Sequence, residues 1–269
     1  MRRGFKDSVV IITGASGGIG RACALRFAAL GARLMLCGRN KERLERVVCE
    51  AVKLGGKARL SCGDVTDPAA VCRMVAEAEG AFGPVDAAVA SAGQYIRGRP
   101  PALRVEAVRA SMEVNFFGTV NLVLAVLPGM LSRRQGHIVA VSSVDGKKGL
   151  PCDAPYVAAK SAVTGFFDSL RQDLRESGVR FSTVLPGRVD TPMLNGLSFP
   201  WVSPKIPPGR VARAIERAIR GNRLEVIVPF AGPKALIVAG AISPRLADGL
   251  IRLFHLEGAH TDNEGSSRV

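Results

Sequence analysis

The sequence predicts a doubly wound α/β fold, in which helices cover both faces of a parallel sheet of about seven strands. Short apolar runs alternate with segments of helical periodicity along most of the chain. A glycine-rich turn follows the first apolar run, and no Pro-, Gly- or Ser-rich linker divides the 269 residues. We therefore expect a single large domain with a well-buried core.

Strands are expected where apolar residues stand together in short runs, at 9–12, 33–37, 58–62, 85–90, 137–142, 179–185 and 225–228. Apolar residues at helical spacing predict helices between them, at 19–30, 41–54, 68–82, 103–133, 154–177 and 209–221. Strands that alternate with helices in this way pair in parallel. Ligands of such sheets bind outside the carboxyl ends of the strands.

Composition narrows the class of protein. The chain has 37 Lys and Arg against 23 Asp and Glu, a formal charge of +14, but the basic residues are scattered and aromatics make up only 5%. Nucleic-acid binding is therefore not expected. The six cysteines form no Cys-x-x-Cys pair, which favours reduced thiols in a cytoplasmic protein over disulfides or a metal site. The first apolar run is too short for a signal peptide, and we expect no transmembrane helix.

A glycine-rich turn at residues 13–20 joins the first strand to the first helix. Its glycines have the spacing G-x-x-x-G-x-G, which allows a tight turn, close approach of backbone amides to a pyrophosphate, and close packing of helix on sheet. The free amides and the dipole of the helix N-terminus attract phosphate. We expect a dinucleotide cofactor to bind at Gly14, Ser16, Gly18, Ile19 and Gly20.

The end of the second strand indicates which nicotinamide dinucleotide binds. An acidic residue about 20 positions after the turn would hold a ribose 2′-hydroxyl, but the chain has Gly38 and Arg39 there. A guanidinium fork matches the oxygens of a 2′-phosphate, so Arg39 favours NADP(H) over NAD(H). The alternative is that Arg39 is a surface residue and that both cofactors are accepted.

Tyr156 and Lys160 lie four residues apart at the start of an expected helix, so their side chains share a face. A nearby ammonium lowers the pKa of a phenol, which is normally about 10. Of the two tyrosines, Tyr95 and Tyr156, only the second has a lysine one turn away. We expect Tyr156 to exchange a proton with a carbonyl or alcohol oxygen, and Lys160 to tune its pKa.

Two serines end the strand at 137–142, at the edge where a parallel sheet presents functional side chains. Ser143 precedes Tyr156 by thirteen residues, and the intervening loop carries Gly146, Gly149 and Pro151. Its hydroxyl is placed to bind a substrate oxygen and to stabilise a developing alkoxide. We favour Ser143 over Ser142 for this role; a turn cap is the alternative.

Over about residues 6–230 the chain resembles the short-chain dehydrogenase/reductase family in its single-domain branch. The resemblance implies a Rossmann-type fold and hydride transfer between NAD(P) and a carbonyl or alcohol. One departure is Ser91, where the family commonly has an asparagine that braces the central strand. The matching residues are the glycine turn, Asp64, Val65, Ala92, Gly93, Asn115, Ser143, Tyr156, Lys160, Pro186, Gly187, Val189 and Thr191.

The resemblance also implies roles for these residues. Asn115 would hold a water that connects Lys160 to solvent, and Lys160 would bind the nicotinamide ribose. Asp64 and Val65 would contact the adenine. Two residues would line the cofactor, Ala92 and Gly93. Four would border its nicotinamide: Pro186, Gly187, Val189 and Thr191.

The substrate pocket is expected to form from residues 93–99, 144–155 and 187–208. Its lining is mostly apolar, which favours a hydrophobic ketone, an acyl chain or a steroid-like ring. Alternatively, these residues merely pack the loops on the domain. The candidate residues are Gln94, Tyr95, Ile96, Val144, Leu150, Met193, Leu194, Leu197, Phe199 and Trp201, the last as part of a lid.

We assign residues 1–230 to an NAD(P)-binding catalytic domain that includes the substrate loop 187–208. Residues 231–257 form an apolar helical cover, and the polar residues 258–269 a disordered tail. The segment 231–257 closes the pocket, packs against the domain or another subunit, or touches an anionic membrane with its basic side. Packing against the domain or another subunit is favoured over membrane contact. The resemblance implies a homodimer or homotetramer through the helices at 103–133 and 154–177.

The sequence therefore predicts an NADPH-dependent enzyme that reduces the carbonyl group of a small, apolar substrate to an alcohol, or catalyses the reverse reaction. An NAD-linked alcohol dehydrogenase is the first alternative. The second is a non-catalytic NADP-binding sensor, although such a protein would be expected to have lost Ser143, Tyr156 or Lys160, and all three are present.

Overall fold

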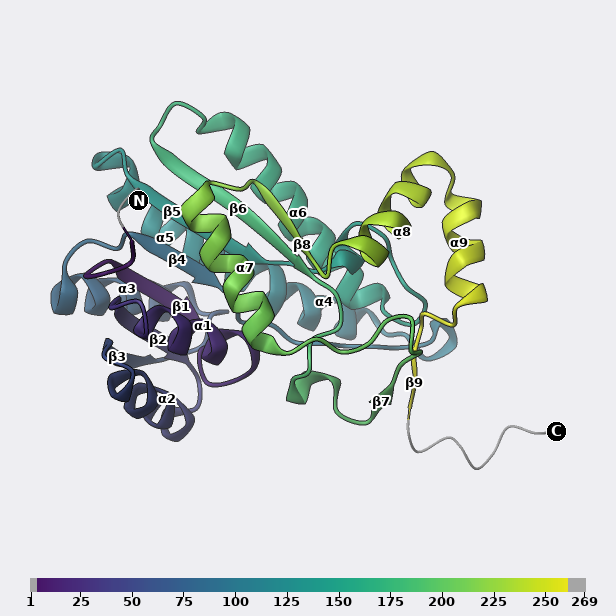
Figure 1. The fold of residues 1–269 in the computed structure, drawn as a ribbon, viewed down its shortest axis with the longest axis horizontal. Coiled ribbons are helices and arrows are strands. Elements are labelled where there is room, and N and C mark those ends of the chain that lie inside the picture. Colours follow the sequence, from purple (N-terminus) through teal and green to yellow (C-terminus); the bar gives the residue numbers. More distant parts are fainter. Residues whose placement is uncertain (1–3, 261–269) are drawn as a thin grey trace.

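The structure, a computed structural model, describes residues 4–260. Seven parallel strands form one sheet in the order β3-β2-β1-β4-β5-β6-β8 (Figure 1). Every expected strand is present, with ends shifted by two residues or fewer, and the predicted fold is confirmed. The strands are β1 (Val9–Thr13), β2 (Arg33–Gly38), β3 (Lys57–Cys62), β4 (Ala87–Ala90), β5 (Gly136–Val141), β6 (Val179–Pro186) and β8 (Glu225–Val228).

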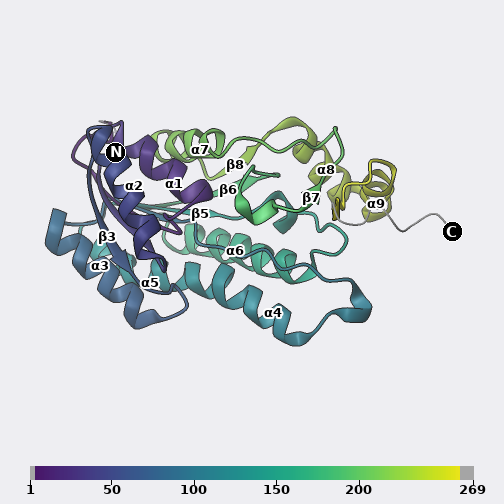
Figure 2. The same ribbon diagram turned by 90° about the horizontal axis from the view of Figure 1, so that it is seen from below.

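Helices cover both faces of the sheet, as Figure 2 shows edge-on. One face carries α1 (Gly18–Ala28), α2 (Lys41–Lys53) and α7 (Pro208–Gly221). The other carries α3 (Pro68–Phe82), α4 (Val105–Met112), α5 (Gly118–Ser132) and α6 (Ala154–Asp173). Because side chains alternate along a strand, Val10 and Ile12 enter the first core while Val9 and Ile11 enter the second. The strands are thus buried on both sides.

The expected helix at 103–133 contains a short stretch of π-helix, Glu113–Phe117, between α4 and α5. By length and composition alone, the segment Val105–Ser132 is apolar enough to cross a membrane, although the sequence led us to expect no such helix. In the fold it packs on the sheet and buries Leu122, Val123 and Val126 in the core. We therefore interpret it as a core helix of the domain.

The C-terminal segment forms two helices, α8 (Ala231–Ile242) and α9 (Pro244–Leu253), which stand beyond the carboxyl ends of the strands (Figure 1). A two-residue strand, β9 (Ala259–His260), then pairs antiparallel with β7 (Leu197–Ser198) of the substrate loop. The expectation of disorder is therefore wrong at residues 259 and 260. The remainder of the expected tail, residues 261–269, lies outside the described residues.

Candidate active site

A cavity of about 730 Å³ opens at the carboxyl ends of the strands. It lies where β1 and β4 are neighbours and the chain crosses to opposite faces of the sheet, the usual ligand site of doubly wound folds. All but one of the predicted catalytic and cofactor-binding residues line it; Gly20 does not. The lining ones are Gly14, Ser16, Gly18, Ile19, Arg39, Asp64, Val65, Ala92, Gly93, Asn115, Ser143, Tyr156, Lys160, Pro186, Gly187, Val189 and Thr191.

The glycine turn presents backbone rather than side chains to the cavity. Gly14 has φ +66°, and a Cβ there would lie 2.8 Å from the backbone of Ala92. A Cβ at Gly20 would lie 2.3 Å from the carbonyl oxygen of Gly14, so Gly20 serves the packing of helix against turn. Helix α1 starts at Gly18 with no side-chain cap in the described chain, which leaves its first amides available to an anion.

At the far end of the turn, Arg39 and Asp64 face each other, with Nη1 3.5 Å from Oδ2 and the arginine side chain 76% exposed. The backbone amide of Thr66, and then its hydroxyl, hold the pKa of Asp64 below its usual range. Arg43, in the first turn of α2, lines the same part of the cavity. Sequence reasoning missed Arg43 because its helical position indicated only a solvated face. The two arginines make this end of the cavity basic.

The end of β4 is braced although Ser91 replaces the usual asparagine. The hydroxyl oxygen of Thr13 accepts hydrogen bonds from the amides of Ser91 (3.2 Å) and Ala92 (3.4 Å). This threonine, at the end of β1, therefore fixes the turn after β4 from the neighbouring strand.

Asn115 is fully buried in the π-helical stretch. Its Nδ2 donates to the carbonyl oxygen of Gln94 at 2.8 Å, and its Oδ1 accepts from the amide of Gln94 at 3.2 Å. A Cβ at Gly93 would lie 2.9 Å from that Oδ1, so a glycine is needed at this close approach. Asn115 thus holds the loop after β4 in place; the water that it would hold stays a prediction.

The two serines after β5 have different roles. The hydroxyl of Ser142 donates to the carbonyl oxygen of Lys160 at 2.9 Å and lies 3.1 Å from the hydroxyl of Thr164, so it anchors α6. The hydroxyl of Ser143 faces the cavity, accepts the amide of Asp145 at 3.1 Å and lies 3.4 Å from the carbonyl oxygen of Pro186. Ser143 also interacts with the hydroxyl of Tyr156.

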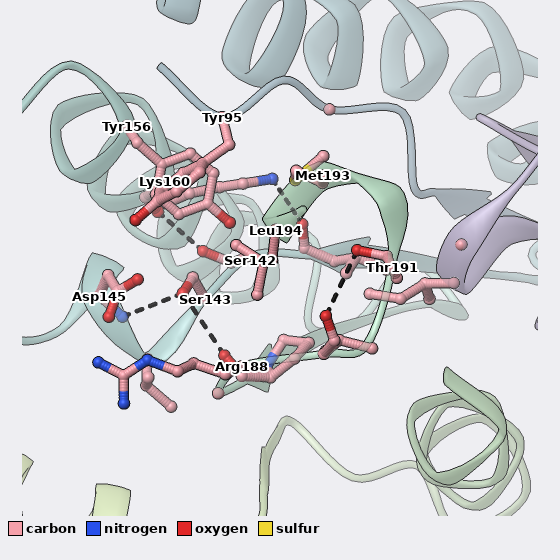
Figure 3. A pocket seen from close by; sticks show the side chains of 18 of the residues that line it. Tyr95, Ser142, Ser143, Asp145, Tyr156, Lys160, Arg188, Thr191, Met193 and Leu194 are labelled. Carbon is pink, nitrogen blue, oxygen red and sulfur yellow. Dashed lines mark hydrogen bonds between the residues drawn. The ribbon is translucent and has the colours of Figure 1, made fainter. Parts of the chain in front are cut away.

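Figure 3 shows Tyr156 and Lys160 together above Ser143. The Nζ of Lys160 donates to the carbonyl oxygen of Val141 at 2.9 Å and lies 5.6 Å from the Tyr156 ring centroid. Burial lowers the pKa of Lys160 to about 8. We expected Lys160 to lower the pKa of Tyr156, but burial, and then the negative charge of Asp145, raise it above its usual value. Tyr156 is therefore a protonated donor at neutral pH.

The substrate loop closes over the glycine turn. The amide of Gly187 donates to the carbonyl oxygen of Val228 at 2.7 Å, which ties the loop to β8. A Cβ at Gly18 would lie 3.2 Å from Cγ2 of Thr191, so this threonine reaches the N-terminus of α1. The loop and α1 thus face each other across the part of the cavity next to Tyr156.

The substrate end of the cavity is apolar on its outer side. Of the expected residues, Tyr95, Val144, Leu150, Met193, Leu194 and Phe199 line it. Trp201 does not act as a lid over it, since its side chain is 88% exposed, and Leu197 is buried in β7. Sequence reasoning named no wall residue from the C-terminal helices, because their placement depends on tertiary contacts. Those helices contribute Leu236, Ile237, Leu250 and Phe254.

The inner side of this end is charged, which the sequence did not reveal. Asp153 accepts hydrogen bonds from the hydroxyl of Tyr95 and from Nε of Arg97, both at 2.8 Å. Arg97 also donates to the carbonyl oxygen of Glu257 at 2.6 Å. Arg188 donates to the carbonyl oxygen of Leu256 and stacks 4.3 Å above the ring of Phe199. The two arginines therefore fasten the segment after α9 to the site.

The short chain dehydrogenase family matches residues 8–199. Dehydrogenase/reductase SDR family member 7B of Rattus norvegicus is 34% identical over 258 residues, covering 90% of this chain and 79% of the relative. The Danio rerio protein of that name is 36% identical, covering 91% and 84%. Among solved structures, a single-residue variant of actinorhodin polyketide ketoreductase with NADPH superposes with a TM-score of 0.77 and 29% identity, over 82% of this chain and 95% of that one.

Proposed function

The chain belongs to the short-chain dehydrogenase/reductase family, and we propose that it reduces an apolar ketone or aldehyde to the alcohol at the expense of NADPH. The observation that carries the proposal is the meeting of Ser143, Tyr156 and Lys160 at one cavity with a basic end and an apolar end. The raised pKa of Tyr156 favours reduction, because a carbonyl needs a proton donor.

In the proposed reaction, the Ser143 hydroxyl holds the substrate oxygen next to Tyr156. Tyr156 donates its proton to that oxygen as negative charge develops on it. NADPH, when bound, supplies the hydride. Lys160 would bind the ribose next to the nicotinamide. Residues 187–191 and the C-terminal helices keep water from the reacting atoms.

The preference for NADPH rests on the basic end of the cavity. Arg39 and Arg43 both line it, and no acidic residue stands at the end of β2 to bind a 2′-hydroxyl. The uncapped start of α1 and its glycines fit the pyrophosphate of either dinucleotide. The ketoreductase that superposes on the chain was solved with NADPH, which agrees with this preference.

The proposal is tested with Tyr156→Phe. The variant keeps the ring and loses the proton, so NADPH-dependent reduction of a panel of apolar ketones should fall by at least about 100-fold. Titration of NADPH fluorescence should show cofactor affinity within a few-fold of the wild type. Activity near that of the wild type would reject Tyr156 as the proton donor.

We also propose that the chain is a cytoplasmic homodimer or homotetramer. All six cysteines are unpaired in the part of the chain described, as suits a reducing compartment. The segment Val105–Ser132 leaves Phe117 44% and Leu124 57% exposed, an apolar surface that a second copy would cover. Light scattering measures the molar mass of the particles that the wild type and Leu124→Glu form. The variant should form a smaller oligomer than the wild type.

Contact with an anionic membrane is a second proposal, carried by α8. Its exposed residues include Ala231, Ala235, Val238 and Ile242, which follow helical spacing and form an apolar face beside the basic residues of α9. Co-sedimentation with anionic vesicles should be lost in the Val238→Glu, Ile242→Glu double variant. Binding that is unchanged in that variant would exclude this face.

A further inference from the structure

Asp145 is a carboxylate that the proposed reaction does not use, although it lines the cavity next to the reacting groups. It follows Ser143 by two residues in the short turn Val144–Gly146, and its amide donates to the Ser143 hydroxyl at 3.1 Å. Figure 3 shows Asp145 beside Ser143, on the side of the cavity toward which Arg188 extends. Asp145 therefore lies in the cavity wall beside Ser143, the residue proposed to hold the substrate oxygen.

Within residues 4–260, neither nearby arginine makes an ion pair with Asp145. Arg97 gives its Nε to Asp153 at 2.8 Å. The guanidinium of Arg188 donates hydrogen bonds to the carbonyl oxygens of Ser203 and Leu256 and stacks on the ring of Phe199. Lys148, which also lines the cavity, is bonded to Asp248 at 2.7 Å. These basic side chains therefore hydrogen-bond other groups, and Arg188 and Arg97 act on Asp145 only through their charges, which lower its pKa.

A carboxylate in this position, hydrogen-bonded to the Ser143 side chain but without an ion-pair partner, is unfavourable in two ways. Burial, and then the charge of Asp153, raise the pKa of Asp145 to about 6, so it is still mostly ionised at neutral pH. The negative charge also lies next to the oxygen that becomes an alkoxide during reduction, where it opposes the developing charge. A hydrogen-bond donor carried by the substrate would relieve both effects, because it would satisfy the carboxylate and screen its charge.

The donor that fits is neutral. The charged groups that act most strongly on Asp145 are Asp153, Arg188 and Arg97, and the formal charges of these four groups cancel. An ammonium group would add an unbalanced positive charge beside two arginines. A hydroxyl adds none, and the apolar outer wall takes the rest of the molecule.

We propose that Asp145 selects substrates with a hydroxyl on the carbon next to the carbonyl, that is, α-hydroxy ketones with an apolar chain. The inference rests on the proposed function and narrows its substrate class. The carbonyl oxygen binds at Ser143 and Tyr156, the hydroxyl donates to the Asp145 carboxylate, and the chain extends toward Leu150, Leu194 and Leu236. Asp145 binds and orients the substrate, whereas the proton still comes from Tyr156.

Three matched ketones test the proposal: a medium-chain methyl ketone, the same ketone with a hydroxyl on its methyl carbon, and the methyl ether of that hydroxy ketone. The ether keeps the oxygen and loses the donor. For the wild type, kcat/KM should be at least about tenfold higher for the hydroxy ketone than for the ether. This ratio should fall to about one in Asp145→Ala and stay unchanged in Asp168→Ala, which removes an exposed carboxylate of α6. Equal values for hydroxy ketone and ether in the wild type would overturn the proposal without any variant.

A binding measurement separates this inference from the proposed function. The diol product and its monomethyl ether are titrated by calorimetry into wild type and Asp145→Ala, each loaded with NADPH, with which an alcohol cannot react. If the wild type binds the diol more tightly than the ether and Asp145→Ala does not, the role of Asp145 is supported. Failure to reduce any ketone would then overturn only the proposed function. If the wild type binds the diol and the ether equally well but still reduces ketones, the role of Asp145 is overturned and the proposed function stands.

Discussion

The ring of Tyr95 meets the ring of Tyr156 edge-on, with centroids 4.9 Å apart and planes at 89°. Tyr95 is itself fixed, because its hydroxyl donates to Asp153, which is only 2% exposed. The orientation of the proposed proton donor therefore depends on a second tyrosine, and through it on a buried carboxylate and Arg97.

Tyr95→Phe should lower the free energy of unfolding by about 1.5–3 kcal/mol, because a buried carboxylate loses a hydrogen bond. Urea unfolding measures this change. The ring contact with Tyr156 remains, so kcat should change little, whereas Tyr95→Leu removes the contact and should lower kcat by about tenfold. Equal kcat in the two variants would show that the ring does not orient Tyr156.

Arg39→Asp should weaken NADPH binding by about 10- to 100-fold, because a charge-assisted hydrogen bond to phosphate is replaced by repulsion. NADH lacks the 2′-phosphate, so its affinity should change by much less. Fluorescence titration with both cofactors measures the difference, and Arg46→Asp, on the exposed face of α2, is the control. Equal losses for the two cofactors would place Arg39 outside the cofactor site.

Lys160 should make the stability of the protein depend on pH. Burial lowers its pKa from 10.5 to about 8, so between these values the unfolded chain binds more protons than the folded one. The free energy of unfolding therefore gains about 3 kcal/mol from this group as pH rises from 8 to 10.5. Lys160→Met should lose this gain in urea unfolding, while Lys53→Met, at the exposed end of α2, should retain it. If the free energy of unfolding depended on pH in the same way for wild type and Lys160→Met, the lowered pKa of Lys160 would be contradicted.

Much of the fold could be predicted from sequence because its signals are local. Short apolar runs bounded by glycine and separated by helical periodicity give parallel strands, and residues that follow such strands meet at one edge of the sheet. This is why Gly14, Ser143 and Pro186, far apart in the chain, line one cavity as expected.

What the sequence could not predict depends on tertiary contacts. Arg43 and Asp145 are charged residues that any solvated turn or helix would contain, and only the fold brings them to the cavity. The pKa of Tyr156 also differs from the expectation, since helical spacing places Lys160 nearby but gives no measure of burial. Trp201 was expected to be a lid, yet its loop turns it outward.

The pairing of β7 with β9 has a practical consequence for work on this protein. The chain leaves the described region at His260 beside the substrate loop, after Arg97 and Arg188 have fastened residues 256 and 257 to the site. A reporter joined directly after His260 would therefore start beside the substrate loop, where it would compete with substrate for the cavity entrance. Kinetic assays are therefore better made with a reporter joined ahead of Val9, since β1 begins at the opposite end of the strands.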